Sequence, residues 1–158
     1  MYTEKIISFL EEIGISVAFC QLEATTFLPG ITIQEGKICI DKEKLSYPGD
    51  ILHEAGHLAV RPASLRASSV GDDFANDGEE IGAILWSFAA AHHLGLPLDF
   101  VFHENGYKGQ AGWLIESFQQ GTYIGLPLLE WMGLTASKEK AKQLQVAPFP
   151  KMLRWLRD

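Results

Sequence analysis

The pentapeptide His53-Glu54-Ala55-Gly56-His57 constrains this chain more than any other sequence feature. Two histidines four residues apart project from the same face of a helix, so both imidazoles can reach one tetrahedral Zn²⁺ at roughly 2.0–2.1 Å. Glu54 is rotated by about a quarter turn or more from His53, which lets its carboxylate reach a metal-bound water without being a ligand. The motif therefore predicts a zinc site with a base beside it, an arrangement suited to hydrolysis.

The residues around the motif predict the helix that it needs. Pro48 and Asp50 form a helix start, and apolar residues such as Ile51 and Leu58 recur at helical spacing between this start and Pro62, which ends the helix. Because the two histidines then lie on a regular helix, their common face follows from the helical repeat alone.

A zinc site of this kind needs a third protein ligand, and Glu79 and Glu80 are the candidates. They follow His57 by 22 and 23 residues, which is enough chain to loop back and bring the first turn of a second helix to the metal. Glu80 shares a helical face with Ile84 and Phe88, the stripe expected to face the core, so it is the preferred ligand. Glu79 lies on a face that could also be buried and stays an alternative. Either choice gives a His₂Glu site with one position open.

Two further groups of residues are candidates for supporting roles. His103 and Tyr107 lie in a Gly- and Asn-containing loop, where a donor to a developing oxyanion can be carried, although both could be ordinary surface residues. Metal-bound histidines usually donate their other N–H to a carboxylate or carbonyl, and Asp72, Asp73 and Asp77 precede the predicted third-ligand helix. One of these aspartates is therefore a candidate partner, with loop solvation and helix capping as the alternative roles.

The segments outside the motif predict an α+β fold. A helix capped by Thr3 and stopped by Gly14 precedes β-branched runs and a Glu35-Gly36 turn, which predict a small antiparallel sheet of about three strands. Asp77 is expected to cap the predicted third-ligand helix, which closes at Gly95. The expected strands and later helices are, in order, 16–22, 31–33, 37–40, 78–93, 110–120, 127–132, 137–144 and 150–157.

Length and charge narrow the organisation and the partners. A chain of 158 residues without a visible linker predicts one domain over residues 1–158, with a core at 1–95 and a helical extension at 96–158. A net charge of −7 and the lack of a basic stripe argue against nucleic acid. No apolar run is long enough to cross a bilayer, and the first residues do not resemble a secretion signal, so we expect a soluble, cytoplasmic protein.

The motif and its surroundings resemble a known family. HEAGH followed by the glutamate of 79–83 resembles the gluzincin metallopeptidases, and the strand pair that leads through 42–50 into the motif helix looks like the ImmA/IrrE-type domain. The run 86–90 is similar to the aromatic-and-alanine stretch after that family's third-ligand glutamate. The resemblance covers about residues 1–95 and implies a minimal zincin-like domain that acts on specific protein partners, often transcriptional repressors.

By this resemblance His53, His57 and Glu80 would be zinc ligands and Glu54 the catalytic base. We therefore expect a zinc-dependent metallopeptidase that hydrolyses peptide bonds in a narrow set of protein substrates. The family usually carries Asn where this chain has Ile84, which leaves a second hypothesis open: a zinc-binding interaction or sensor module that cleaves nothing. A zinc hydrolase of a small amide is a third.

Overall fold

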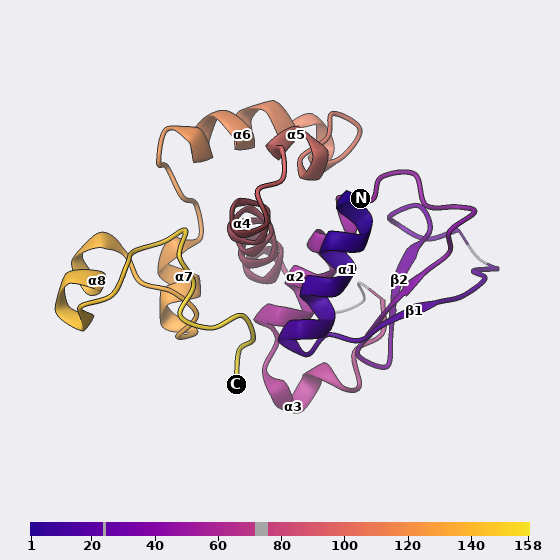
Figure 1. Ribbon diagram of the computed structural model, residues 1–158, viewed down its shortest axis with the longest axis horizontal. Helices are drawn as coiled ribbons and strands as arrows, with labels where there is room; N and C mark the ends of the chain where they lie inside the picture. The colour runs from indigo at the N-terminus through magenta and orange to yellow at the C-terminus, as the bar shows by residue number, and fades with distance from the viewer. Residues whose placement is uncertain (24, 72–75) are drawn as a thin grey trace.

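The computed structural model of the protein describes residues 1–23, 25–71 and 76–158, and its α+β architecture confirms the expected fold class (Figure 1). The sheet lies at one side of the molecule, α4 runs through the middle, and α7 and α8 lie at the opposite side. The elements in chain order are α1 (Tyr2–Ile13), β1 (Val17–Phe19), β2 (Ile31–Gln34), β3 (Lys37–Ile40), α2 (Asp50–Val60), α3 (Ala63–Arg66), α4 (Asp77–Leu94), α5 (Leu98–Val101), the 3₁₀ turn η1 (Tyr107–Gly109), α6 (Ala111–Gln119), α7 (Leu126–Trp131) and α8 (Lys138–Leu144).

Helix α1 is amphipathic and covers part of the core. Its buried residues include Ile6 and Leu10, which lie four apart on one face, as the apolar spacing predicts. The helix ends at Gly14, whose φ of 98° lies in the left-handed region that glycine adopts without strain. The expected start is wrong by two residues, because the helix begins at Tyr2 and Thr3 is inside it rather than capping it.

The three-stranded sheet forms as expected, but one strand pairs differently. Strand β2 pairs antiparallel with β3 across a two-residue turn, where Glu35 (φ 48°) and Gly36 (φ 75°) take the positive φ values of a tight hairpin. Strand β1 lies on the other edge of β3 and pairs parallel to it, with Val17 opposite Ile38, so the antiparallel expectation is wrong for β1. The long connection 20–30 allows this crossing, because it lets the chain pass from β1 to the far side of the hairpin.

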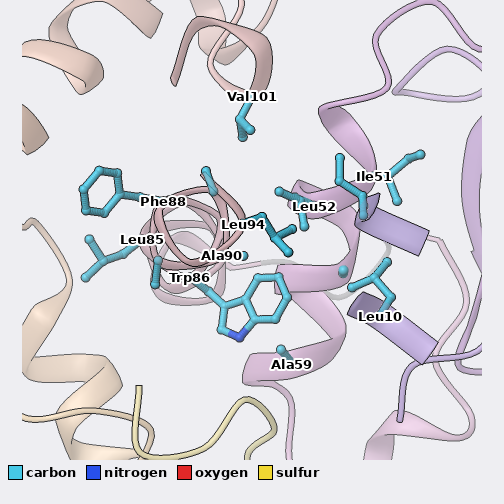
Figure 2. Packing of buried hydrophobic residues seen from close by; sticks show 14 of the residues in the cluster. Leu10, Ile51, Leu52, Ala59, Leu85, Trp86, Phe88, Ala90, Leu94 and Val101 are labelled. Atoms are coloured by element: carbon cyan, nitrogen blue, oxygen red, sulfur yellow. The ribbon is translucent and has the colours of Figure 1, made fainter. Parts of the chain in front are cut away.

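Helices α2 and α4 pack in direct contact at the centre of the fold. Every residue of α2 is buried, and a Cβ at Gly56 would lie only 2.7 Å from the carbonyl oxygen of Ala83 on α4. The two backbones therefore touch at a position that only glycine allows. Figure 2 shows the indole of Trp86 reaching from α4 toward α2, close to Ala59.

The start of α4 differs by one residue from the sequence expectation. The cap is Asn76, whose side-chain oxygen accepts a hydrogen bond from the Glu79 backbone N–H at 2.8 Å. Asp77 is the first helical residue and is not the cap. The expected end is confirmed, because Gly95 closes the helix in the left-handed conformation (φ 67°).

The last expected helix, 150–157, does not form. Proline is tolerated at a helix start, so the reason lies in tertiary contacts: backbone groups of this segment bond to distant elements. The carbonyl oxygen of Trp155 accepts from Nε1 of Trp86 at 2.9 Å, and the N–H of Arg157 donates to the carbonyl of Ala59. The C-terminal segment therefore links the last turn of α2 to the middle of α4.

One cluster of buried side chains includes residues from the whole length of the chain, from Ile6 on α1 through Trp86 on α4 to Phe118 on α6. Among the described residues, no helix combines the length and the apolar character that crossing a bilayer requires.

The contact at Gly56 yields a stability prediction. In Gly56→Ala, the new methyl group has to push α2 and α4 apart, so we expect the free energy of unfolding to fall by about 1–3 kcal/mol, as for other overpacked cores. Gly112→Ala is the matched control: it also lies in a helix, a Cβ there meets nothing within 4 Å, and alanine favours helix by up to about 1 kcal/mol. Urea unfolding of the metal-free variants measures both. Equal stability of the two variants would contradict the close contact.

Candidate metal centre

Three side chains bring their ligand atoms together where α2 meets the start of α4. Nε2 of His57 lies 3.2 Å from Nε2 of His53 and 2.9 Å from Oε2 of Glu80, and Nε2 of His53 lies 3.3 Å from Oε1 of Glu80. A tetrahedral zinc with bonds of 2.0–2.1 Å holds its ligand atoms about 3.3 Å apart. The donor set, two imidazoles and one carboxylate, therefore fits a divalent metal ion in both chemistry and spacing.

The local folding of each element explains this convergence. His53 and His57 are one helical turn apart on α2, which is buried on all sides and so has a fixed orientation. Glu80 lies in the first turn of α4, which the Asn76 cap fixes, and the close approach at Gly56 brings that turn against α2. The helical-phase argument for Glu80 over Glu79 thus agrees with the residues that the structure groups.

Glu79 supports the site from behind instead of joining the group of potential ligands. Its Oε1 lies 2.8 Å from Nδ1 of His57, the ring nitrogen opposite the potential metal-binding nitrogen, and accepts hydrogen bonds from Nε and Nη2 of Arg61 at 3.0 and 2.8 Å. A carboxylate on the far nitrogen orients a ligating imidazole and keeps Nε2 available for a metal. Arg61 in turn balances the charge of Glu79 where both are largely buried.

The close contacts between His57 and the two glutamates shift the pKa values of His57 and Glu80 in the metal-free site. Burial lowers the pKa of His57, but the hydrogen bonds to Glu79 and Glu80 outweigh it and raise the pKa to about 9. Burial raises the pKa of Glu80, and the hydrogen bonds from His53 and His57 more than reverse that effect, so its pKa is held well below the ordinary range. At neutral pH without a metal, His57 is therefore protonated and paired with the Glu80 carboxylate.

Glu54 lies beside the three potential ligands in an open cleft. Two adjoining hollows of about 220 and 300 Å³ share Phe27, His53, Glu80 and Lys108, and we call them together the metal cleft. Glu54 is buried and lines the larger hollow. The motif thus places its glutamate in the same space as the imidazoles without adding it to the group of potential ligands.

Tyr107 lines the metal cleft, whereas His103 lines neither of its two hollows. The ring of Tyr107 packs edge-on against His53 at 5.4 Å between centroids, and its buried hydroxyl has no hydrogen-bond partner among the described residues. Burial raises the pKa of Tyr107 well above its ordinary value, and the charge of Asp50 adds to the effect, so the hydroxyl keeps its proton. His103 lies next to Tyr107, with 6.3 Å between ring centroids, and its Nε2 lies 2.7 Å from Oδ1 of Asp50.

Sequence reasoning missed two residues that shape this site. Arg61 and Asp50 flank the motif helix, and their roles depend on partners 18 and 53 positions away in the chain. A charged residue at each end of the motif helix was a possible signal, but one sequence does not show that these residues are buried.

Of the three aspartates expected to support a histidine, Asp72 and Asp73 lie outside the described residues. Asp77 is exposed and lines the rim of the metal cleft.

Comparisons with known proteins add no relative: no family model matches the chain, and no curated protein or solved structure matches it significantly. The class of protein therefore rests on the fold and the site of this chain alone. The protein is an α+β chain in which two histidines of one helix and a glutamate of the next could hold a metal ion.

The different positions of the two glutamates predict different losses of zinc affinity. Glu79→Gln removes the charge that orients His57, and we expect zinc to bind about 10–100-fold more weakly, as for other partners of metal ligands. Glu80→Ala removes a donor itself and should cost more than that. Competition with a chromophoric zinc chelator measures both, with circular dichroism to check the fold. A larger loss in Glu79→Gln than in Glu80→Ala would assign the ligand to Glu79.

The raised pKa of His57 predicts that zinc binding depends on pH. At pH 7 the metal-free ring is protonated, and a metal needs the free electron pair of Nε2, so binding releases about one proton from His57. The apparent affinity should rise up to tenfold per pH unit until about pH 9. Calorimetry in buffers of different ionisation enthalpy measures the proton release. Glu79→Gln, which removes one of the hydrogen bonds that raise this pKa, should release fewer protons at pH 8, and an unchanged value would contradict the assignment.

Proposed function

We propose that the protein is a zinc-dependent metallopeptidase that hydrolyses peptide bonds in a narrow set of protein substrates. The observation that carries this proposal is the placement of Glu54 in the same cleft as the converging donors of His53, His57 and Glu80. Two imidazoles and one carboxylate leave a position open on a tetrahedral ion, which is the arrangement that hydrolytic zinc sites use. The early resemblance to the gluzincins supports the same conclusion from the motif.

Each residue near the cleft has a role in the proposed reaction. Zinc, when bound, supplies a Lewis acid that polarises a carbonyl and makes a coordinated water acidic near pH 7. Glu54 accepts the proton of the attacking water and returns it to the leaving amine. Tyr107 keeps its proton because it is buried, so its hydroxyl is available to donate a hydrogen bond to the developing oxyanion. His103 and Asp50 hold each other beside this tyrosine.

The rim of the metal cleft supports an extended substrate. Phe27 is 82% exposed and borders both hollows, so its ring is available to contact a substrate side chain. Lys108, in the 3₁₀ turn η1, also borders both hollows and adds a positive charge. A cleft lined by both an aromatic ring and a cation favours some substrate side chains over others, which fits a narrow substrate range.

One observation favours the second candidate, a zinc-binding module without catalysis. Ile84 lies one helical turn after Glu80 and lines the smaller hollow with an apolar side chain, where a polar residue could hold the glutamate from its own helix. A less firmly held ligand is compatible with metal binding and less suited to positioning a reacting water.

The decisive experiment compares the parent chain with Glu54→Gln. Both are loaded with zinc and incubated with a peptide library derived from digested cellular protein, and new amino termini are identified by mass spectrometry. We expect both proteins to bind about one zinc per chain and cleavage to fall by about 10²–10⁴-fold in the variant, the range for loss of a general base. Asp99→Asn, the same kind of charge change at an exposed residue that lines neither hollow, is the matched control and should cleave normally.

The other outcomes separate the candidates. Cleavage that is unchanged in Glu54→Gln would contradict the role of this residue. Zinc at full occupancy without cleavage of peptides, or of intact proteins in a lysate, would favour the non-catalytic module. Failure to bind zinc would exclude all three zinc-dependent hypotheses.

A further inference from the structure

A second hollow, of about 530 Å³, lies beside the metal cleft and shares only Asn76 with it. Its walls come from the C-terminal end of α2, from α3, from the first turn of α4, from α7 and from the C-terminal segment. Neither the motif histidines nor Glu80 line it. We call it the arginine pocket, because Arg61 and Arg157 are its cationic residues.

Arg61 forms part of the wall of this pocket. The residue is only 4% exposed, and its Nε and Nη2 both bind Glu79. Its Nη1 is buried and has no hydrogen-bond partner among the described residues. Because this nitrogen is closed to solvent, a direct hydrogen bond to a ligand in the pocket falls to Arg157 rather than to Arg61.

Arg157 supplies the second cation. Its Nη1 donates to the carbonyl of Val60 at 3.2 Å, and its guanidinium lies over the ring of Trp131 at 5.0 Å from the centroid. Glu79 is the only acidic residue among the described residues that line the pocket, and Arg61 already neutralises it. The charges of the described residues that line the pocket therefore sum to one excess positive charge, which complements a monoanion.

The rest of the pocket is an apolar wall with an exposed aromatic ring. Trp131 is 72% exposed and Leu65 57% exposed, and Leu128 and Met132 line the same hollow. Large apolar side chains around a concave space with a few polar groups are the usual composition of a small-molecule site, and 530 Å³ is within the usual range of volumes. The exposed face of Trp131 offers a stacking surface next to the two guanidinium groups.

We propose that the arginine pocket binds a small monocarboxylate with an aromatic or aliphatic body. The carboxylate bonds to the guanidinium of Arg157, and the body packs on Trp131 and Leu65. Guanidinium groups match a carboxylate in both charge and donor geometry. The site is separate from the proposed peptidase chemistry, although Arg61 connects it through Glu79 to His57.

The test uses the metal-free protein, because carboxylates also coordinate zinc directly. Phenylacetate, 4-phenylbutyrate and octanoate are titrated by calorimetry, each against its neutral amide. We expect at least one acid to bind saturably and at least tenfold more tightly than its amide. Arg157→Met should weaken the acid by about tenfold or more and leave the amide unchanged, and Trp131→Leu should weaken both.

Arg154→Met is the matched control. It removes the same charge from the same C-terminal segment, and Arg154 pairs with Asp158 without lining the pocket. Arg61→Met is avoided, because it would leave the carboxylate of Glu79 buried without its cation. Three results would each overturn the proposal. The first is equal binding of acid and amide, and the second is no saturable binding of any of the three acids at millimolar concentration. The third is an equal loss of affinity in Arg154→Met and Arg157→Met. None of these results depends on zinc or on peptidase activity.

Discussion

The direct contact between α2 and α4 is the constraint on which the candidate site depends. At Gly56 the two backbones approach so closely that a methyl group does not fit against Ala83. This approach brings the first turn of α4 within reach of the motif face of α2, and only then can Glu80 meet both histidines. The small residue inside the motif therefore matters for the geometry as much as the ligands do, since a wider helix spacing would leave two imidazoles without a carboxylate.

The charges around this contact are balanced in a chain that runs through the protein interior. Arg61 holds Glu79, Glu79 holds His57, and His57 meets Glu80 at the metal cleft. Buried charges of this kind are stable only when each has a partner, because removal from water penalises each one separately. The same chain of contacts joins the metal cleft to the arginine pocket, so two chemically different hollows share one set of supporting side chains.

Much of this arrangement was predictable from local patterns. The helical repeat placed His53 and His57 on one face, helical phase favoured Glu80 over Glu79, and the Glu35-Gly36 pair marked the hairpin. The errors fall where local signals compete. Asn76 and Asp77 are both good caps, and the structure uses Asn76. Residues 150–157 have a helical spacing of apolar residues, but their backbone groups bond to α2 and α4. The direction of β1 depends on the path of the long connection after it, and the residues of a three-residue strand do not determine that path.

The sequence by itself determined the motif helix, the α+β class and the identity of the candidate ligands, because these follow from residue spacing within a few helical turns. Only the tertiary structure decided which side chains support the ligands. Arg61 finds Glu79 across 18 residues and Asp50 finds His103 across 53. The reason is physical: a hydrogen bond between distant residues forms only after packing brings their elements together. Burial, which makes such a bond necessary, is a property of the folded chain and not of any segment of it.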